Sequence, residues 1–522
     1  MAPSQSSYVG VIVLVVVIGA GLVLGLSGLG DDSVAAPSTS TTTTVATDES
    51  TAPSEPTTST SSTLPVIDPT DPGEPGPGVG EVGGPWGTVD GLLMFRGNPT
   101  RTWYGTGPMP LTTPERVWRY PSSGGMCSQS VNLGETKTWC GTGWTGQPAV
   151  WERPDGVTEV IFGAYDRAVH FVDAATGQDT RQSLVTGDII KGSVSIDPDG
   201  FPLLYTGSRD NKTRIIALDR EPVETLWSID SNDYPGLWND DWDSNPVIID
   251  DVMYQGAENG KWFAIELNRA YDADGRVTVD PEILHIITTY DDELIAKVGD
   301  QIVSVENSTL VVGETAFFAN SAGRVLGVDI SNIREEAPIV FDWWAGDDVD
   351  ATLVGDADGF VYVTAELERY NSRAEEVGQL IKLDPSRPDD PFVWGVQVGP
   401  GSGAYGGMWA TPALGDGVIY NNTESGRLIA VDTGTGEVIW EDSVGHHAWG
   451  SPVIVDQYLL APVNCEAGGG FRQYDISDPR NPVRMWQYDH QGSCIESTPA
   501  VWNGEIFVGS RDGYLYKWAA TG

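Results

Sequence analysis

Residues 430–440 read AVDTGTGEVIW, and weaker copies of this stretch and of the strands before it recur along the chain. Each copy starts with a small residue two positions before a proline, or before the residue that aligns with this proline in the other copies. The eight starts are Gly146, Gly192, Ser244, Asn307, Ala351, Ala410, Gly450 and Ser497. Starts spaced about 40 to 60 residues apart indicate a repeat fold with units longer than leucine-rich or ankyrin repeats.

Each unit contains the signals of four short strands. A β-rich run such as residues 418–420 is followed by a turn at 425–426, a second run at 428–432 and a closing strand that usually ends in Trp. Four short strands per unit are typical of a propeller blade. We therefore predict an all-β, eight-bladed β-propeller, with seven blades as the alternative.

The last unit ends soon after Trp518 and lacks an outer strand. Residues 114–120, PERVWRY, lie upstream of the first unit and have the pattern of that missing strand. A strand from the start of the domain that completes the final blade would close the ring and remove two open sheet edges.

The N-terminal region predicts a membrane anchor followed by a stalk. Residues 8–29 are uninterruptedly apolar, and about 20 such residues span a bilayer as a helix. The alternative is a signal peptide cleaved after residues 34–36, VAA; the length of the run, the absence of Lys and Arg from residues 1–7 and Pro37 after the site argue against it. No Cys lies near the run, which excludes a lipoprotein anchor.

The stretch after the anchor is rich in Thr and Ser at 37–65 and in Asp, Pro and Gly at 68–85, and cannot bury enough apolar surface to fold. The predicted organisation is a transmembrane anchor at 1–30, a disordered linker at 31–90 and the propeller at 91–522. We expect a single-pass protein of the cell membrane with its propeller on the extracytoplasmic side.

The charge of the chain restricts its partners. Asp and Glu number 74 against 29 Lys and Arg, for a net charge of −45, so repulsion argues against nucleic acid and anionic membrane surfaces. A salty habitat, calcium binding and a cationic partner each remain compatible with this charge. We expect the propeller to be a monomer.

The four cysteines predict two disulfides. None forms a C-x-x-C pair of the kind that binds zinc, and nearest-neighbour pairing joins Cys127 with Cys140 and Cys465 with Cys494. Two disulfides would imply an oxidising compartment. Four unrelated buried thiols are the alternative.

A family resemblance rests on TGEVIW at 435–440, the A-x-D before it and MFRGNP at 94–99. These stretches resemble pyrroloquinoline-quinone-like (PQQ-like) propeller repeats, a family that includes quinoprotein alcohol dehydrogenases and the lipoprotein propeller of the bacterial outer-membrane assembly machine. The resemblance covers about residues 91–522 and is strong only in the sixth and eighth units. It implies an eight-bladed ring in which a blade-closing Trp packs between neighbouring blades. The residues in that position are Trp227, Trp394, Trp440, Trp486 and Trp518.

Departures from the family pattern bear on function. The first unit has Arg181 where the closing Trp would stand, and insertions occur at 268–279 and 366–378. The alcohol dehydrogenases of the family commonly place two adjacent cysteines beneath the quinone, and this sequence has no adjacent pair. That absence weakens the enzyme interpretation without removing it.

The repeats also predict a candidate binding site. In a propeller the residue three before each aligned proline position should face the mouth of the central funnel. These residues are Thr145, Lys191, Asp243, Glu306, Asp350, Trp409, Trp449 and Glu496. Such a ring could bind a hard cation through its carboxylates, or a sugar or cationic group against its Trp faces; the alternative is a solvated, water-filled channel in which Lys191 offsets one acid.

Two classes of function follow. We expect a membrane-anchored, non-catalytic binding or scaffold module, without cofactor, that holds a cell-envelope protein or small ligand at its funnel. The alternative, implied by the resemblance, is a PQQ- and calcium-dependent quinoprotein dehydrogenase that oxidises alcohols or sugars. There Trp409 or Trp449 would stack on the quinone, Glu306 and Asn307 would bind calcium, and Asp243 or Asp350 would be the base.

Overall fold

The structure is a computed structural model that describes residues 80–521 apart from positions 133, 144–145, 402–404, 465–468 and 491–492. The predicted anchor at 1–30 and most of the predicted linker lie outside these residues. Among the described residues, no helix is long and apolar enough to cross a membrane. Residues 80–90 of the predicted linker are described, and Trp86 is buried among residues of the third and fourth blades.

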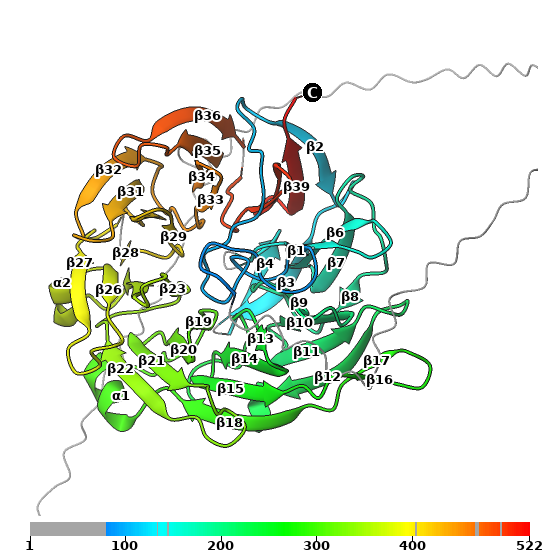
Figure 1. Cartoon of the computed structure of the whole chain (residues 1–522), viewed down its shortest axis with the longest axis horizontal. Helices are drawn as coiled ribbons and strands as arrows, with labels where there is room; N and C mark the ends of the chain where they lie inside the picture. The colour runs from blue at the N-terminus through cyan, green and yellow to red at the C-terminus, as the bar shows by residue number, and fades with distance from the viewer. Residues whose placement is uncertain are drawn as a thin grey trace, which may run out of the picture. The chain divides into compact units, whose positions relative to one another are not determined.

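Eight antiparallel sheets stand around a common centre, and each is one blade of the predicted propeller (Figure 1). From the inner to the outer strand, blade 1 contains β1 (Gly91–Leu92), β5 (Ala149–Glu152), β6 (Thr158–Ala164), β7 (Ala168–Asp173) and β8 (Leu184–Val185). Blade 2 contains β9 (Ser195–Ile196), β10 (Leu203–Gly207), β11 (Lys212–Ala217) and β12 (Glu224–Asp230). Blade 3 contains β13 (Val247–Ile249), β14 (Val252–Ala257), β15 (Lys261–Glu266) and β18 (Glu282–Thr288). Blade 4 contains β19 (Leu310–Val312), β20 (Thr315–Ala319), β21 (Arg324–Asp329) and β22 (Ile339–Trp344).

The second half of the ring repeats this order. Blade 5 contains β23 (Val354–Gly355), β24 (Val361–Thr364), β26 (Leu380–Leu383) and β27 (Phe392–Val396). Blade 6 contains β29 (Ala413–Leu414), β30 (Val418–Asn422), β31 (Arg427–Asp432) and β32 (Val438–Ser443). Blade 7 contains β33 (Val453–Val455), β34 (Tyr458–Val463), β35 (Gly470–Asp475) and β36 (Val483–Asp489). Blade 8 contains β37 (Ala500–Trp502), β38 (Glu505–Ser510), β39 (Tyr514–Ala519) and, as its outer strand, β2 (Glu115–Tyr120).

The remaining elements are insertions between these strands. They are the hairpin of β3 (Cys127–Asn132) and β4 (Glu135–Cys140), the hairpin of β16 (Ala270–Tyr271) and β17 (Val277–Thr278), the pair of β25 (Glu366–Leu367) and β28 (Gly406–Gly407), the 3₁₀ helix Ser231–Asp233, and helices α1 (Asp292–Val298) and α2 (Ser372–Val377). The all-β, eight-bladed prediction is therefore confirmed.

The ring closes between the two ends of the domain, as the sequence predicted. Strand β2 pairs with β39, with Glu115 opposite Ala519 and Tyr120 opposite Leu515. Trp118 of β2 donates its Nε1–H to the carbonyl of Ala174 in blade 1 at 3.0 Å. Trp118 is therefore the closing Trp of blade 8. Trp518, which the sequence placed in that role, lies one strand further in, on β39, and is fully buried.

The repeat stretch 430–440 forms the end of β31, a tight turn and the start of β32. The Asp432 carboxylate accepts the N–H groups of Gly434 and Thr435 at 3.1 and 3.0 Å, which fixes the turn. Gly436 has a φ of 74°, and a Cβ there would lie 2.9 Å from the Trp394 ring of blade 5. Trp394 in turn donates Nε1–H to the carbonyl of Thr433 at 3.0 Å. The repeated Trp and T-G turn thus join one blade to the next.

Blade 1 makes the same connection with a different residue. Arg181 is hydrogen-bonded to Glu159 at 3.0 and 3.1 Å and donates Nη1–H to the carbonyl of Leu218 in blade 2 at 2.7 Å. An arginine therefore replaces the closing Trp without loss of the contact between blades.

In blades 4 to 6 the residue after the small-residue start hydrogen-bonds to the next blade, and these bonds join the inner strands of blades 4 to 7. The N–H of Ser308 donates to the Thr352 hydroxyl at 2.9 Å, that of Thr352 to the Thr411 hydroxyl at 3.0 Å, and that of Thr411 to the Ser451 hydroxyl at 3.0 Å. Each short hydroxyl side chain caps the backbone of the preceding blade, which explains why Ser and Thr recur before the proline position.

The centre of the ring is filled by protein. Residues 91–105 enter the channel, where β1 pairs with β5 (Figure 1). Two buried arginines of this segment bind the surrounding backbone. Arg96 donates to the carbonyls of Pro452, at 3.0 Å, and Pro412; Arg101 donates Nε–H to the carbonyl of Thr309 at 3.1 Å. Burial lowers the pKa of Arg101 to about 9, with Arg96 adding to the effect. The stretch 94–101 is thus a plug that binds blades 4, 6 and 7, and the predicted alternative of a solvated funnel concerns the mouth above it.

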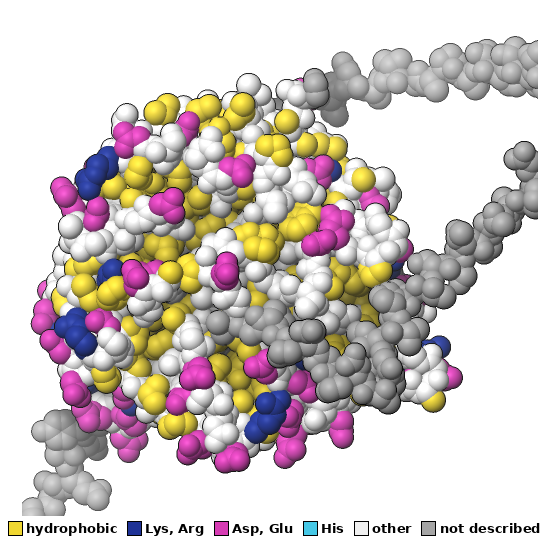
Figure 2. Space-filling model, in the orientation of Figure 1, with side chains coloured by type: hydrophobic (Ala, Val, Ile, Leu, Met, Phe, Trp, Pro, Cys, Tyr) yellow, Lys and Arg dark blue, Asp and Glu magenta, His cyan; other side chains and the backbone are white. Residues whose placement is uncertain are grey.

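The predicted pairing of Cys127 with Cys140 is confirmed, and this disulfide joins the two ends of the β3–β4 hairpin. Cys494 is also disulfide-bonded, whereas its predicted partner Cys465 lies outside the described residues. Acidic side chains outnumber Lys and Arg over the visible face of the propeller (Figure 2), in keeping with the net charge of −45.

Candidate functional site

The predicted funnel residues lie at one end of the ring, where the chain enters the inner strand of each blade. We call this side the funnel face. Thr145 lies outside the described residues. The other seven occur directly before blades 2 to 8. Six of them fall into three groups: an acid cluster with Lys191, a second acid group around Asp350, and a pair of stacked indoles. The seventh, Glu496, forms an ion pair with Arg511.

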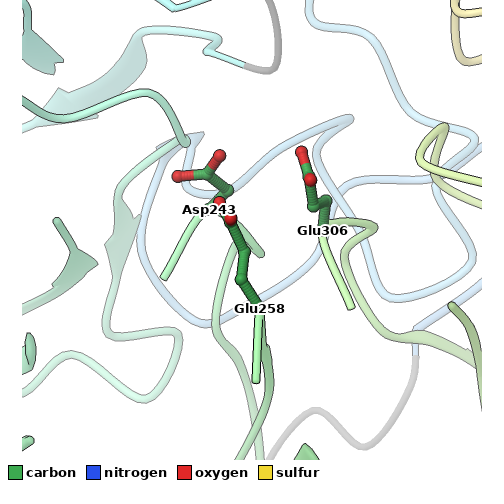
Figure 3. A group of neighbouring side chains, drawn as sticks. All are labelled: Asp243, Glu258 and Glu306. Atoms are coloured by element: carbon green, nitrogen blue, oxygen red, sulfur yellow. The ribbon is translucent and has the colours of Figure 1, made fainter. Parts of the chain in front are cut away.

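The acid cluster contains Asp243, Glu258 and Glu306, whose carboxylate oxygens lie within 4.8 Å of one another (Figure 3). Lys191 forms ion pairs with Asp243 and, at 3.0 Å, with Glu258. Burial lowers the pKa of Lys191, but the two carboxylates outweigh it and hold that pKa well above the usual value. The ammonium group therefore remains charged and neutralises part of the cluster.

The carboxyl groups of this cluster respond to burial and to one another. Burial raises the pKa of Asp243 to about 7, although Lys191 opposes the shift. Burial, with the nearby charge of Asp350, raises the pKa of Glu306 well above its usual value. For Glu258 burial raises the pKa, but Lys191 and hydrogen bonds from Asp243 and Asn239 outweigh it, so the net shift is downward.

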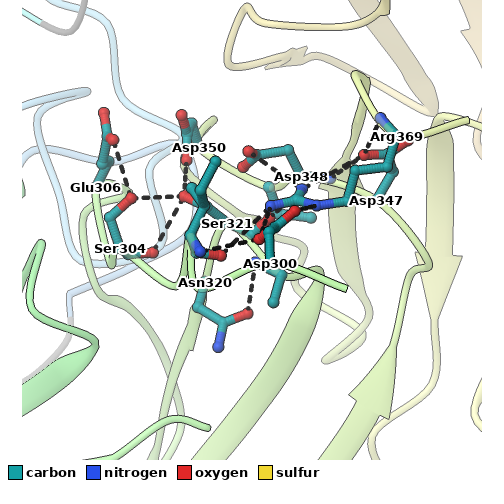
Figure 4. Close-up of polar contacts among 12 residues, drawn as sticks. Asp300, Ser304, Glu306, Asn320, Ser321, Asp347, Asp348, Asp350 and Arg369 are labelled. Atoms are coloured by element: carbon teal, nitrogen blue, oxygen red, sulfur yellow. Dashed lines mark hydrogen bonds and ion pairs between the residues drawn. The ribbon is translucent and has the colours of Figure 1, made fainter. Parts of the chain in front are cut away.

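The second acid group continues around the funnel from Glu306. Ser304 donates to Glu306 at 3.1 Å, Ser321 donates to Asp350 at 2.8 Å, and the two hydroxyls lie 2.7 Å apart (Figure 4). Beyond them Arg369 forms ion pairs with Asp300, Asp347 and Asp348 at 2.8, 3.6 and 3.5 Å. One arginine thus offsets three acids.

The aromatic part of the funnel comes from blades 6 and 7. The indoles of Trp409 and Trp449 are stacked, with centroids 4.9 Å apart and planes at 16°. Buried Glu424 accepts the Nε1–H of Trp449 at 2.7 Å and also binds His447 Nδ1. The sequence therefore predicted that both Trp residues lie at the funnel, but it did not predict their stack or the carboxylate that orients it.

A cavity of about 370 Å³ opens beside these groups on the funnel face. We call it the mouth pocket. Its lining residues are Val131 and Trp139 of the β3–β4 hairpin, together with Lys191, Arg209, Trp238, Asn239, Glu258, Glu306, Trp449, Glu496 and Arg511. Four were predicted: Lys191, Glu306, Trp449 and Glu496.

The sequence analysis missed Arg209, Glu258 and Arg511. The three residues occupy equivalent positions in their repeats. Each lies in the turn between the second and third strands of its blade, as does Glu424. These turns reach the same end of the ring as the starts of the inner strands. Reading the second turn of every repeat would have found them.

The residues do not fit the calcium and quinone that the resemblance implies. The Asn307 amide is engaged with the backbone: Nδ2–H donates to the carbonyls of Ala319 and Val349 at 2.8 and 2.9 Å, and Oδ1 accepts the Ala319 N–H at 2.9 Å. The Lys191 ammonium group already pairs with Asp243 and Glu258, the carboxylates beside Glu306. The cavity bounded by Phe95, Glu306, Asp350 and Trp409 measures only about 10 Å³. We therefore derive no chemical step from calcium or from a quinone. That Glu306 and Asn307 bind a metal stays a prediction from the sequence.

Fold and site together define the class of protein: a plugged eight-bladed propeller with a charged and aromatic mouth pocket. Residues 378–522 match the family model PQQ_2, described as outer membrane protein assembly factor BamB. The match spans blades 6 to 8 and the end of blade 5, and it confirms the predicted resemblance to PQQ-like propeller repeats. No curated protein matches the chain.

Solved structures provide further comparisons. Sqt1 of Saccharomyces cerevisiae is similar with a TM-score of 0.50 and 10% identity, over 70% of this chain and 93% of that chain. The computationally designed Ika8 protein has a TM-score of 0.47 and 12% identity, over 79% and 100%. BamB from Moraxella catarrhalis has a TM-score of 0.37 and 11% identity, over 78% and 98%. The likeness to Sqt1 supports the propeller fold alone.

Proposed function

We propose that this protein is a non-catalytic binding or scaffold module, anchored in the cell membrane by residues 1–30, whose funnel face receives a protein or another cell-envelope ligand. The mouth pocket carries this proposal. It is concave, and it combines indole rings with fixed donors and acceptors, which is the composition of ligand sites. The plug closes the channel, so a ligand is held at the mouth and does not pass through.

The described chain before β1 lies away from the funnel face. The N–H of Thr88 donates to the carbonyl of Pro198 at 2.7 Å, in the turn where β9 ends and β10 begins. That turn lies at the end of the inner strand opposite Lys191. The described segment before β1 therefore contacts the propeller on the face opposite the funnel, which leaves the mouth pocket uncovered by this segment.

Two further observations support the proposal. The Cys127–Cys140 disulfide is of the kind that persists in oxidising compartments, in keeping with a location outside the cytoplasm. The match of residues 378–522 to a family described as an outer membrane protein assembly factor favours a scaffold role over catalysis.

Capture from solubilised cell envelopes tests the proposal. We expect the immobilised full-length protein to retain envelope protein or glycan above an empty-matrix control, and Glu306→Gln to reduce that retention at least about fivefold, because a central acid of the pocket is lost. Asp416→Asn is the matched control, since Asp416 is exposed in the turn between β29 and β30 on the opposite face. Equal retention by Glu306→Gln and wild type, or none by either, contradicts the proposal.

A further inference from the structure

The mouth pocket has a balanced charge although the protein is strongly acidic. Three cations, Lys191, Arg209 and Arg511, and three acids, Glu258, Glu306 and Glu496, line it. Each cation already has an acid partner: Arg511 binds Glu496 at 2.8 Å, Arg209 binds Asp241 at 2.7 Å, and Lys191 binds Glu258 at 3.0 Å. No lining cation is therefore left over to bind an anionic ligand, and the acids Glu258 and Glu496 are each already paired with a cation.

Three indoles form the apolar part of the same pocket, and each is held in place. Trp449 is stacked on Trp409 and bound by Glu424. The guanidinium groups of Arg209 and Arg511 lie over Trp139, at 5.9 and 5.4 Å from its ring centroid. The disulfide at the base of the β3–β4 hairpin fixes the strand that carries it.

Trp238 is held at the mouth in a strained conformation. It is 42% exposed, and its φ of 74° lies in the left-handed region that bulky residues avoid. Its neighbours keep it there: the Leu237 N–H donates to the carbonyl of Asn259 at 3.2 Å, and the Asn239 amide donates to Glu258 at 2.8 Å. Strain that the surroundings enforce on an exposed indole is typical of ligand clamps.

Polar groups without partners lie in and behind the pocket wall. The Trp139 indole N–H has no hydrogen-bond acceptor among the described residues. Behind it, at 5.5 Å between ring centroids, the Tyr165 hydroxyl is fully buried and also has no hydrogen-bond partner among the described residues. Burial raises the pKa of Tyr165 to about 12, so the phenol remains a neutral donor. Leaving the Trp139 N–H of the pocket wall unpaired costs free energy that a hydroxylated ligand could recover.

We propose that the mouth pocket binds a neutral saccharide, such as the end of a cell-envelope glycan; this rests on the proposed binding function and names its ligand class. The C–H faces of a pyranose ring pack against indoles, and its hydroxyls donate to carboxylates and accept from ammonium and guanidinium groups. A pocket of about 370 Å³ suits a small ligand of this kind.

Calorimetric titration of the full-length protein in detergent tests the inference with six probes. Maltotriose, mannotriose and chitotriose are neutral trisaccharides; the glucosamine trimer, trigalacturonate and spermidine are charged comparisons. We expect one-to-one binding of at least one neutral trisaccharide with a Kd below about 1 mM, and weaker binding of every charged probe. Binding of no neutral trisaccharide, or tighter binding of a charged probe, overturns the inference.

The decisive variant is Trp238→Gly. It removes the indole and relieves the strained φ, so we expect an unchanged or raised Tm together with at least about tenfold weaker saccharide binding. Tyr370→Gly is the matched control, because Tyr370 is also exposed, at 37%, has a φ of 51° and does not line the pocket. Unaltered affinity in Trp238→Gly overturns the assignment of the pocket.

The two proposals fail in distinguishable ways. If envelope capture yields a protein partner that Glu306→Gln releases while no neutral trisaccharide binds, the saccharide inference is wrong and the binding module stands. If neither ligand is found, both are wrong.

Discussion

Lys191 is the residue on which the charge balance of the funnel depends. Its side chain is 11% exposed and forms ion pairs with Asp243 and Glu258. Among the described residues, neither acid has another ion pair. Removing one partner of a buried pair leaves an uncompensated charge, which is more destabilising than the pair is stabilising.

We therefore expect Lys191→Met to lower the free energy of unfolding by about 3 kcal/mol. Urea denaturation at pH 8 measures this. Lys297→Met is the control: its ion pair with Glu293, at 3.9 Å on the surface of α1, should contribute under about 0.5 kcal/mol. A loss for Lys191→Met no larger than the control's would show that the cluster does not need the ammonium group.

The acids of the funnel should make the protein less stable as the pH rises. Glu368 precedes Arg369 and lies near Asp350 and Asp347 of the second acid group. Burial raises the pKa of Asp243 and of Glu368 to about 7, with Asp350 adding to the shift of Glu368. The folded state then binds more protons than the unfolded state between about pH 4 and pH 7, so this contribution to stability is complete below pH 4 and is lost as pH rises through 7. Glu368→Gln should flatten the decline of Tm between pH 5 and 8, and an unchanged slope would contradict the assignment.

At the scale of elements, the turn within residues 430–440 is where one blade contacts another. Two features of position 436 require glycine. Its φ is 74°, and a Cβ there would lie 2.9 Å from the Trp394 ring. Gly417, in the turn between β29 and β30, has only the first of these features, with a φ of 69° and no atom within 4 Å of such a Cβ.

Alanine substitution at these two glycines separates the cost of backbone strain, which both positions share, from the cost of the Trp394 contact, which only Gly436 has. Gly417→Ala should cost about 1 kcal/mol from the left-handed backbone alone, and Gly436→Ala about 2 to 4 kcal/mol because the Trp394 ring must also move. Equilibrium denaturation of both variants gives the difference. Equal losses would mean that the turn does not couple the blades.

Most of the fold could be predicted because each blade repeats the same short-range signals. The outer strand β2 could be predicted because residues 114–120 have a strand pattern but belong to no repeat, while the last repeat has no outer strand. The plug could not: Arg96 and Arg101 bind the carbonyls of Pro412, Pro452 and Thr309, and nothing in the sequence marks a backbone carbonyl as a partner. Trp518 was misplaced because the closing Trp of blade 8 lies 400 positions earlier in the chain, at Trp118.

The candidate site was predicted only for residues that share the repeat register. Seven of these residues lie directly before the inner strands of their blades, as the repeat alignment predicts: Lys191, Asp243, Glu306, Asp350, Trp409, Trp449 and Glu496. Trp139 and Trp238 come from the β3–β4 hairpin and from the segment between blades 2 and 3, which have no counterpart in other blades. Their place in the pocket depends on how these segments fold over the funnel.

At the scale of the whole molecule, ring closure and the plug should make folding cooperative. A chain that begins at residue 122 lacks both β2 and the plug, which leaves β39 as an open edge and the inner carbonyls without donors. We expect it to lose the single sharp unfolding transition in urea, whereas a chain that begins at residue 80 keeps the full-length midpoint. A sharp transition in the shorter chain would show that blades 1 to 8 do not need the N-terminal segment.

The most direct test of the central claim is site-specific photocrosslinking in intact cells from the funnel mouth. A benzophenone side chain at position 238 lies at the mouth pocket, whereas one at Val438 lies on the outer strand β32 and is exposed away from it. A funnel-binding module predicts a defined adduct from position 238, reduced by Glu306→Gln, and none from position 438. Adducts from both positions alike, or from position 438 alone, would contradict the claim that the funnel is the binding face.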